Sequence, residues 1–521
     1  MSSLPHQSSA AILPKRRNNL SFSAGEISLN HSRIEPLNRR QDIAAILPRR
    51  GNDVSLSPGE RAGVRAGFLS APIQLPVHGK GRLPTSRRAF LKTLGAAALA
   101  SPFITSNLLA DPPSRRIRHA SFGAAGMAWA DLTQIANCPN VDIVAVCDVD
   151  LTHMADAKKQ FPTARFYQDW RELLDQEAKN IDSVNVSTPD HMHAPIGVSA
   201  MQLGKHVYGQ KPLAHEIHEV RRLTQLAHEK KLVTQMGIQI HSDAYYRMAV
   251  QMLQDEVIGK IKAVHSWCNK SWGDPEAKPD RADPVPAGFD WNLWLGVCAD
   301  RPFIGDTYYH PGNWRKRLDF GTGTLGDMGC HIFDPVFGGL GLAAPVAVRS
   351  DGPRPNAWNW ALNGQVLYTF DGTRHTSDHT LPVTWYDGTA KPPDDVIALV
   401  EGDYPANAGS IFIGTAGVML LPHYELPTLY PRTQFKDFKI PRLPGLKHWG
   451  QFINACRGED KTTADFAYAG PLTETILLGT IASRFPHTTL NWHSRKLRFD
   501  LHAANQYVRR DYRPGWKIKG L

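Results

Sequence analysis

Short apolar runs alternate with helix-like segments through the middle of the chain. The first run, 116–122, ends at a glycine-rich turn, and a helix-like pattern begins at Trp129. A second run, 141–147, ends on an acid, and a third, 183–187, ends in a polar segment before another helix. Because short strands that alternate with helices are typical of α/β folds, this order predicts an α/β domain.

The turn after the first predicted strand has the residues that a dinucleotide site needs. Gly123 supplies a tight turn, Gly126 and Met127 open the helix, and Ala128 stands where glycine or alanine is accepted for close packing. Ala125 occupies the second glycine position, where its methyl group narrows the gap to a phosphate. A glycine turn that places a helix N-terminus against a pyrophosphate predicts dinucleotide binding, and Ala125 weakens the pattern without excluding it.

Asp148 strengthens this interpretation, because it ends the next strand 25 residues after Gly123, close to the spacing of a ribose-binding acid. A carboxylate there accepts hydrogen bonds from ribose hydroxyls and repels a 2′-phosphate. We therefore predict NAD in preference to NADP. The alternative is a solvated residue at the end of a strand.

A polar segment, Thr188-Pro189-Asp190-His191-Met192-His193, follows the third predicted strand. Polar residues at the carboxyl ends of parallel strands belong to the ligand crevice of such folds. The segment therefore supplies four candidate cofactor contacts, namely Thr188, Pro189, His191 and His193. For the two histidines a structural role is an equal alternative, since His193 could cap the following helix.

Residues 1–110 are predicted to be a leader outside the fold. Residues 85–110 combine Arg87-Arg88, a mildly apolar stretch and a small-residue end, which resembles a twin-arginine (Tat) export signal. The stretch is too short and too polar for a permanent membrane anchor. Residues 1–84, rich in Pro, Gly, Ser and Arg, are predicted to be a disordered extension or the product of a mis-assigned start.

The leader predicts that the protein meets the Tat export machinery and is exported to the periplasm; if the signal is not used, the location is cytoplasmic. It also explains the net charge of +10, since residues 1–110 hold 15 Lys+Arg and 5 Asp+Glu. The remaining 44 basic and 44 acidic residues balance, which gives no reason to expect nucleic-acid binding.

The six cysteines form no Cys-x-x-Cys pair and are predicted to be reduced and structural.

At residues 204–213, Gly-Lys-His-Val-Tyr-Gly-Gln-Lys-Pro-Leu, the chain resembles the Gfo/Idh/MocA oxidoreductase family. That family includes glucose–fructose oxidoreductases and inositol dehydrogenases, and typically has Gly-Lys-His-Val followed by Glu-Lys-Pro. Lys211 and Pro212 match this motif. Gln210 replaces the glutamate, so this position carries no charge here.

The resemblance continues at Asp327 and His331, which match the family's Asp-x-x-x-His element, and covers about residues 116–516. Segments near the C-terminus look like the end of a bacterial branch of the family. The resemblance implies a Rossmann domain, 115–241, followed by an α/β domain, 242–516, built on a large, mainly antiparallel open sheet. Several segments of the second domain alternate apolar and polar residues, as such a sheet should. Its expected strands are 261–267, 346–350, 365–370, 375–381 and 410–414.

The motif residues suit hydride transfer from a carbinol. Such a step needs a base for the hydroxyl proton and a cation beside the developing alkoxide. Asp327 and His331 are spaced i, i+4 and would share one face of a helix. By resemblance, His331 is the acid/base, Lys211 polarises or positions the substrate oxygen, and Asp327 orients the histidine or binds a substrate hydroxyl. Gln210 and Lys211 complete the expected cofactor contacts.

No third ligand lies at a metal-like spacing from Asp327 and His331, so the sequence predicts no metal site. Trp314 and Arg315 are candidate substrate contacts: the indole could stack on a sugar ring, and the guanidinium could bind hydroxyls or a carboxylate. The alternative is a packed loop anchored by Trp314.

Three functions stay open. The first is an NAD(P)-dependent oxidoreductase that transfers a hydride between nicotinamide and a secondary alcohol of a sugar, cyclitol or derivative. The second is an NAD-dependent glycosidase acting by transient oxidation and elimination, and the third is a non-catalytic binding protein on the same scaffold. An exported enzyme would have to hold its NAD tightly. The resemblance also allows a homo-oligomer built on the second sheet.

Overall fold

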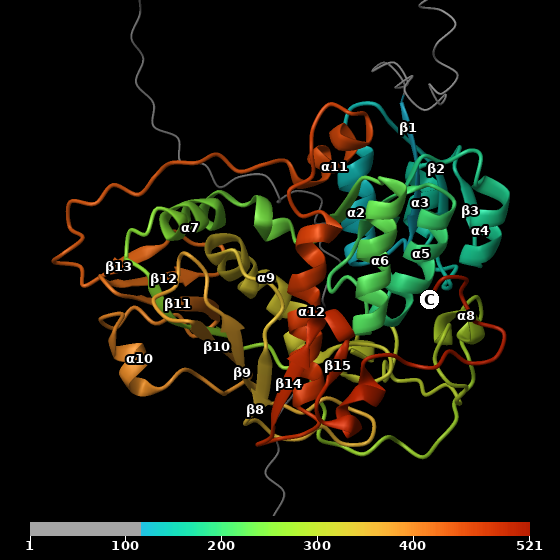
Figure 1. The fold of residues 1–521 in the computed structure, drawn as a ribbon. Helices are drawn as coiled ribbons and strands as arrows, with labels where there is room; N and C mark the ends of the chain where they lie inside the picture. The colour runs from blue at the N-terminus through green and yellow to red at the C-terminus, as the bar shows by residue number, and fades with distance from the viewer. Residues whose placement is uncertain (1–115) are drawn as a thin grey trace, which may run out of the picture. The chain divides into compact units, whose positions relative to one another are not determined.

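The computed structural model describes residues 116–521 (Figure 1). The predicted export signal at 85–110 and the extension at 1–84 lie outside the described residues. Within 116–521, no helix combines the length and the apolar character that a membrane span requires.

The first half of the described chain folds around a six-stranded parallel sheet with the order β3-β2-β1-β4-β5-β6. The strands are β1 (Ile117–Phe122), β2 (Val141–Cys147), β3 (Arg165–Tyr167), β4 (Ser183–Val186), β5 (His206–Gly209) and β6 (Thr234–Met236). The helices are α2 (Met127–Ala136), α3 (Ala155–Gln160), α4 (Trp170–Glu177), α5 (His193–Gln202) and α6 (Ile217–Lys230). The chain leaves β1 and β4 toward opposite edges of the sheet, so their carboxyl ends open the ligand crevice of a Rossmann fold. The predicted parallel sheet is confirmed.

The second half contains a nine-stranded sheet with the order β13-β12-β11-β7-β10-β9-β8-β14-β15. Its pairings are antiparallel apart from that of β7 with β10, which confirms the expected mainly antiparallel sheet. The strands are β7 (Ile261–Cys268), β8 (Ala347–Ser350), β9 (Gln365–Asp371), β10 (Thr380–Asp387), β11 (Ala408–Gly414), β12 (Val418–Pro422), β13 (Thr428–Tyr430), β14 (Thr489–His493) and β15 (Arg498–Phe499).

The remaining helices are α7 (Ala244–Gln254), α8 (Trp291–Leu295), α9 (Gly323–Leu340), α10 (Asp394–Ala398), α11 (His448–Cys456) and α12 (Phe466–Ala482). Short 3-10 turns are η1 (Asp190–Met192), η2 (Gln239–Ser242), η3 (Asn313–Lys316), η4 (Ser494–Lys496) and η5 (His502–Tyr507). After β13 the chain returns to the first half, where α11 packs against α2, and α12 then leads it back to β14 and β15 of the second sheet. Figure 1 shows this return beside the first sheet.

One expected strand, 375–381, is wrong in its position, because β10 begins only at Thr380. In the turn before it, the Thr376 hydroxyl accepts a hydrogen bond from the Thr373 N–H and donates one to the Thr373 carbonyl. Such local side-chain bonds replace the ladder bonds of a strand.

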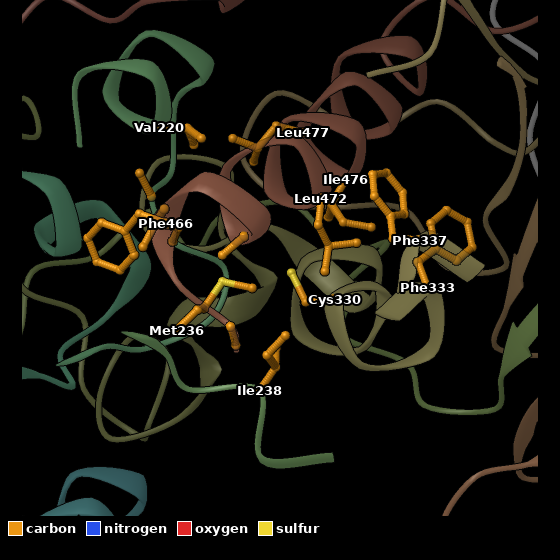
Figure 2. Packing of buried hydrophobic residues seen from close by; sticks show 14 of the residues in the cluster. Val220, Met236, Ile238, Cys330, Phe333, Phe337, Phe466, Leu472, Ile476 and Leu477 are labelled. Carbon is orange, nitrogen blue, oxygen red and sulfur yellow. The ribbon is translucent and has the colours of Figure 1, made fainter. Parts of the chain in front are cut away.

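One hydrophobic core joins the two halves, because α12 packs against α6 of the first half and α9 of the second. Figure 2 shows Val220 of α6, Leu477 of α12, and Cys330 and Phe333 of α9 in this cluster. Helix α9 is buried along nearly its whole length. Because close-packed interiors yield little, α12 fixes α9 and its Asp-x-x-x-His element relative to the first half.

Candidate active site

A cleft of about 770 Å³ lies where the carboxyl ends of the parallel strands meet the second half. Its walls come from the turn after β1, the ends of β2, β4 and β5, helix α9, and segments of the second half. The structure thus brings together residues that the sequence predicted from separate motifs. The predicted site residues that line the cleft are Gly123, Ala125, Gly126, Met127, Asp148, Thr188, Pro189, His193, Gln210, Lys211, Trp314, Arg315, Asp327 and His331.

The nucleotide end of the cleft, defined here by Gly123, Gly126 and Asp148, is shaped by the backbone. Gly123 has φ of 101° and lies so close to the residue after β4 that a Cβ atom would lie 2.6 Å from the carbonyl oxygen of Ser187. At Gly126, a Cβ would meet nothing within 4 Å, and no side chain caps helix α2. An open, uncapped helix N-terminus beside a tight glycine turn fits the pyrophosphate of a dinucleotide.

Asp148 is fixed by two backbone donors. Its carboxylate accepts hydrogen bonds from the N–H of Ala124 at 2.9 Å and from the N–H of Asp150 at 3.0 Å. A carboxylate offers about four acceptor positions, so lone pairs are left for ribose hydroxyls. The residues at this end therefore fit an adenosine ribose.

The second half also reaches the nucleotide end. His310 Nε2 lies 3.1 Å from an Asp150 carboxylate oxygen, and the His153 and His310 rings lie 4.8 Å apart. Asp150, His153 and His310 bring three potential metal-ligand atoms within 4.8 Å of one another. The sequence did not predict this set, because His310 lies far along the chain from Asp150 and His153 and shares no short motif with them.

The two histidines after β4 have structural roles, because their rings bond to backbone carbonyl groups of neighbouring segments. His191 does not line the cleft, in contrast to its prediction as a cofactor contact: it is buried between Trp294 and Phe320, and its Nε2 donates to the Trp294 carbonyl. The ring nitrogens of His193 lie 2.7 Å from the carbonyl oxygen of Thr188 and 2.8 Å from that of Pro212. His193 thereby ties the loop after β4 to the Lys-Pro turn.

Gln210 has a structural reason to replace glutamate. Its Nε2 donates to a carboxylate oxygen of Asp131, a buried acid on α2 that also accepts from Ser187 and Trp449. Burial raises the pKa of Asp131, while these donors lower it. A glutamate at position 210 would set two carboxylates against each other, whereas the amide supplies the donor that Asp131 needs.

The substrate end of the cleft, defined here by Lys211, Asp327 and His331, is built from charged side chains. Lys211 Nζ donates to the Asp327 carboxylate at 2.7 Å and to the Asp327 backbone carbonyl at 2.7 Å. Burial opposes ionisation of Asp327, but the cations of Lys211, Arg315 and Lys270 outweigh it and hold the pKa of the carboxyl well below its usual range. Asp327 is therefore a fixed carboxylate.

Asp327 and His331 share helix α9, as predicted, but Asp327 does not orient the histidine. Its oxygens accept from Lys211 and from Trp272 Nε1, the latter at 2.9 Å. His331 Nδ1 is buried and has no hydrogen-bond partner among the described residues. Burial, followed by the Lys211 ammonium, lowers the pKa of His331 well below its usual range, so the imidazole is neutral at pH 7.

Trp314 is largely taken up by its neighbours. The Arg315 guanidinium lies 4.3 Å from the centre of the Trp314 ring, and the indole is buried in the aromatic cluster around Trp294. Arg315 and the aromatic neighbours therefore cover the Trp314 ring, which limits the sugar stacking that the sequence predicted.

Four residues near the substrate end were not predicted: Lys270, Trp272, His423 and Tyr424. Lys270 and Trp272 follow the end of β7, a predicted strand, so polar residues after a strand were an available signal. His423 and Tyr424 follow β12, which the sequence did not predict. The His423 ring lies 6.2 Å from that of His331.

The fold is that of a Rossmann domain followed by a mainly antiparallel α/β domain, with the cleft at the carboxyl edge of the parallel sheet. The model described as "Oxidoreductase family, NAD-binding Rossmann fold" matches residues 116–238, and "Oxidoreductase family, C-terminal alpha/beta domain" matches residues 258–376. The chain belongs to the Gfo/Idh/MocA family of oxidoreductases.

Among curated relatives, a levoglucosan dehydrogenase of Pseudarthrobacter phenanthrenivorans is 24% identical over 34% of this chain and 38% of its own. An alpha-N-acetylgalactosaminidase of Shewanella oneidensis is 24% identical over 34% of this chain and 44% of its own. The chain thus spans less than half the length of these relatives. The fold is similar to that of the WlbA dehydrogenase from Bordetella pertussis in complex with NADH and UDP-GlcNAcA: the TM-score is 0.51 and the identity 15%, covering 73% of this chain and 99% of that one.

Proposed function

We propose that the protein oxidises a secondary alcohol of a sugar, cyclitol or derivative, with NAD as hydride acceptor. One observation carries the proposal: the cleft that begins at the glycine turn also contains a lysine ammonium fixed at 2.7 Å by Asp327, beside a neutral histidine. The similarity to a levoglucosan dehydrogenase supports a carbohydrate substrate.

The dinucleotide would be held by the glycine turn, the N-terminus of α2 and Asp148, and when bound it supplies a hydride acceptor. We assign it as NAD because a 2′-phosphate would meet the Asp148 carboxylate. Two backbone donors fix that carboxylate, so it cannot swing aside without breaking both bonds.

At the substrate end, Lys211 and His331 have separate roles. Lys211 Nζ would donate to the substrate oxygen and stabilise the developing negative charge, with Asp327 fixing its position. His331 would accept the hydroxyl proton at Nε2, since Nδ1 is buried. The C–H bond breaks as the hydride leaves, the O–H proton passes to His331, and a carbonyl forms.

The lowered pKa of His331 has a consequence for the pH profile. The histidine acts as a base only when neutral, and its pKa lies well below the ordinary value of 6.5. We therefore expect kcat/KM to hold from neutrality down to about pH 6, where an ordinary histidine would already be largely protonated. An acid limb centred near about pH 6.5 would contradict this base assignment.

The function is tested first on the full-length protein, purified from the cytoplasm and denatured to release any bound nucleotide. Mass spectrometry that finds stoichiometric NAD(H) supports an enzyme that retains its cofactor, and reduction of bound or added NAD is then followed with sugars and cyclitols. A protein that contains no nucleotide and binds no added dinucleotide would refute the proposal.

A second candidate is an NAD-dependent glycosidase that oxidises its substrate transiently, eliminates the aglycone and re-reduces the product. The similarity to an alpha-N-acetylgalactosaminidase favours it. Net cleavage of a glycoside without added NAD would support this candidate, whereas accumulation of reduced cofactor would support the dehydrogenase.

We also propose export through the Tat pathway, on the Arg87-Arg88 segment. Because the periplasm has no ready NAD pool, an exported enzyme must carry its cofactor with it. N-terminal sequencing of the periplasmic protein tests this: a mature start near residue 111 supports export, and recovery only of the uncleaved chain in the cytoplasm opposes it.

A further inference from the structure

The substrate end carries more positive than negative charge. Three cations share the Asp327 carboxylate: Lys211 Nζ at 2.7 Å, Arg315 Nε at 3.3 Å and Lys270 Nζ at 3.5 Å. One carboxylate neutralises one of them. Within residues 116–521, neither Lys270 nor Arg315 has another carboxylate within 4.0 Å.

Nearby groups do not remove the surplus. Asp190, the other acid in this part of the cleft, is buried and accepts a hydrogen bond from the Thr322 hydroxyl at 2.6 Å. Even when Asp190 is counted, the cations exceed the carboxylates. The histidines His331 and His423 add no negative charge, and burial keeps both neutral at pH 7, lowering the pKa of His423 to about 4.

The two surplus cations are accessible, and Arg315 is also held in place. The side chain of Lys270 is 51% exposed and that of Arg315 is 26% exposed, and both residues line the cleft. The Arg315 guanidinium lies 4.3 Å from the centre of the Trp314 ring and 5.5 Å from that of Trp272. A guanidinium fixed on aromatic faces keeps its planar donors free for a carboxylate or phosphate.

The surplus is not explained by the dinucleotide. Its pyrophosphate has a place at the open N-terminus of α2, and a 2′-phosphate would meet Asp148. Lys211 suffices to polarise a substrate oxygen. Lys270 and Arg315 therefore have no assigned partner in the proposed reaction.

We propose that the substrate is an anionic carbohydrate, a sugar acid whose carboxylate is bound by Lys270 and Arg315 while its hydroxyl faces Lys211 and His331. The inference rests on the proposed function and narrows its substrate class. A sugar phosphate offers the same anionic chemistry, so the test includes one.

The experiment uses the full-length, NAD-loaded protein and three probes that differ in charge: glucose, glucuronate and glucose 6-phosphate, with the galactose series in parallel. Formation of reduced nicotinamide gives kcat/KM for each. We expect the sugar acid to exceed the neutral sugar at least about tenfold, and the ratio to shrink as salt screens the charges. A larger kcat/KM for the sugar phosphate would assign the site to phosphate instead of carboxylate.

Lys270→Gln and Arg315→Gln should each lower the acid-to-neutral ratio about fivefold or more. The matched control is Lys278→Gln, in the same segment: its ammonium lies over the Trp358 ring, and it does not line the cleft. This control should leave the ratio unchanged.

Equal kcat/KM for glucose and glucuronate would overturn the inference while leaving the dehydrogenase function intact. If no probe reduces NAD, calorimetric binding of the same probes to the loaded protein decides. Tighter binding of the acid, lost in Lys270→Gln, would support the anion site although the proposed reaction fails. Equal or absent binding of all probes would overturn it.

Discussion

The nucleotide end and the substrate end of one cleft are built from different materials. The nucleotide end is made mainly by one contiguous stretch of chain, 123–150, whose backbone supplies the tight turn, the open helix N-terminus and the donors that fix Asp148. The substrate end is made by side chains from segments far apart in the sequence, gathered around the single carboxylate of Asp327. Binding at the nucleotide end therefore depends on steric fit, and chemistry at the substrate end depends on the balance of charges.

This difference predicts how each end fails. A change of shape at the nucleotide end should harm folding and cofactor binding together, because the same backbone serves both. A change of charge at the substrate end should alter turnover or substrate preference while the protein folds and binds nucleotide normally. Variants at the two ends test this separation.

Lys211→Ala should have the largest effect. It removes the cation beside the substrate oxygen and leaves Asp327 without its closest partner. Loss of one such donor costs about 10²–10³-fold in turnover, so we expect kcat to fall about 10³-fold while NAD binding changes little. Steady-state kinetics and a fluorescence titration with NAD measure the two quantities separately.

The matched control is Lys205→Ala, in the segment before β5, whose ammonium donates to the Ile181 carbonyl and does not line the cleft. It should keep wild-type kcat. If Lys211→Ala retains more than about a tenth of the activity, the lysine is not the polarising cation.

Gly123→Ala should break the nucleotide end. The new Cβ would lie 2.6 Å from the Ser187 carbonyl oxygen and 2.7 Å from the Ala128 Cβ, at a backbone φ of 101°. Strain at such a residue costs on the order of 1–3 kcal/mol, so we expect about that loss in the free energy of unfolding and at least tenfold weaker NAD binding. Urea unfolding and NAD titration measure both.

Gly312→Ala is the control for this change, because Gly312 has a φ of −131° and a Cβ there would meet nothing within 4 Å. Its free energy of unfolding should change by less than about 0.5 kcal/mol. Normal stability and NAD affinity in Gly123→Ala would show that the chain after β4 can shift at Ser187.

The two ends also differ in how well the sequence predicts them. Gly123, Gly126 and Asp148 lie at fixed spacings along one strand–turn–helix–strand unit, and local geometry follows from local sequence. The strands β1, β2 and β4 were predictable for the same reason, since each is a short apolar run before a turn or a polar segment, whereas β3, β5 and β6 were not predicted as strands. The strand 375–381 was misplaced because its threonines are typical of strands, whereas here the Thr376 side chain bonds to the Thr373 backbone and stabilises a turn.

The substrate end was predicted only in part. The family resemblance identified Lys211, Asp327 and His331, but it did not identify the partner of Asp327. The i, i+4 spacing suggested His331 as that partner. In the folded protein, the Asp327 carboxylate bonds to Lys211 and Trp272 instead. No periodicity in the sequence predicts that the residues after β7 and β12 lie beside helix α9. Contacts of that kind depend on how the second sheet packs, which a single sequence does not encode in any local pattern.

Asp148→Asn should have an intermediate effect at the nucleotide end. The amide keeps one oxygen acceptor, but its NH₂ group would face either the Ala124 or the Asp150 N–H. We expect NAD to bind about tenfold more weakly and the preference over NADP to shrink, because the charge that repels a 2′-phosphate is gone. Titrations with both cofactors measure the preference, and Asp156→Asn on the exposed face of α3 is the control. An unchanged NAD-to-NADP ratio would remove Asp148 from cofactor selection.

Trp272→Phe should have the smallest effect, because it removes one of several groups that hold the Asp327 carboxylate. The indole Nε1 donates to Asp327 at 2.9 Å, and the ring also lies beneath the Arg315 guanidinium. A phenyl ring keeps the aromatic face and loses only the donor, and a hydrogen bond to a charged group contributes about 1.5 kcal/mol or more. Because Lys211 and Arg315 still hold the carboxylate, we expect kcat to fall only about threefold to fivefold, with NAD affinity unchanged.

Trp358→Phe, at an exposed indole in the second half, is the control and should match wild type. A loss in Trp272→Phe as large as that in Lys211→Ala would mean that Asp327 depends on the indole as much as on the lysine. A loss of NAD affinity in Trp272→Phe would contradict the separation itself, since a change confined to the substrate end would then reach the nucleotide end through the fold.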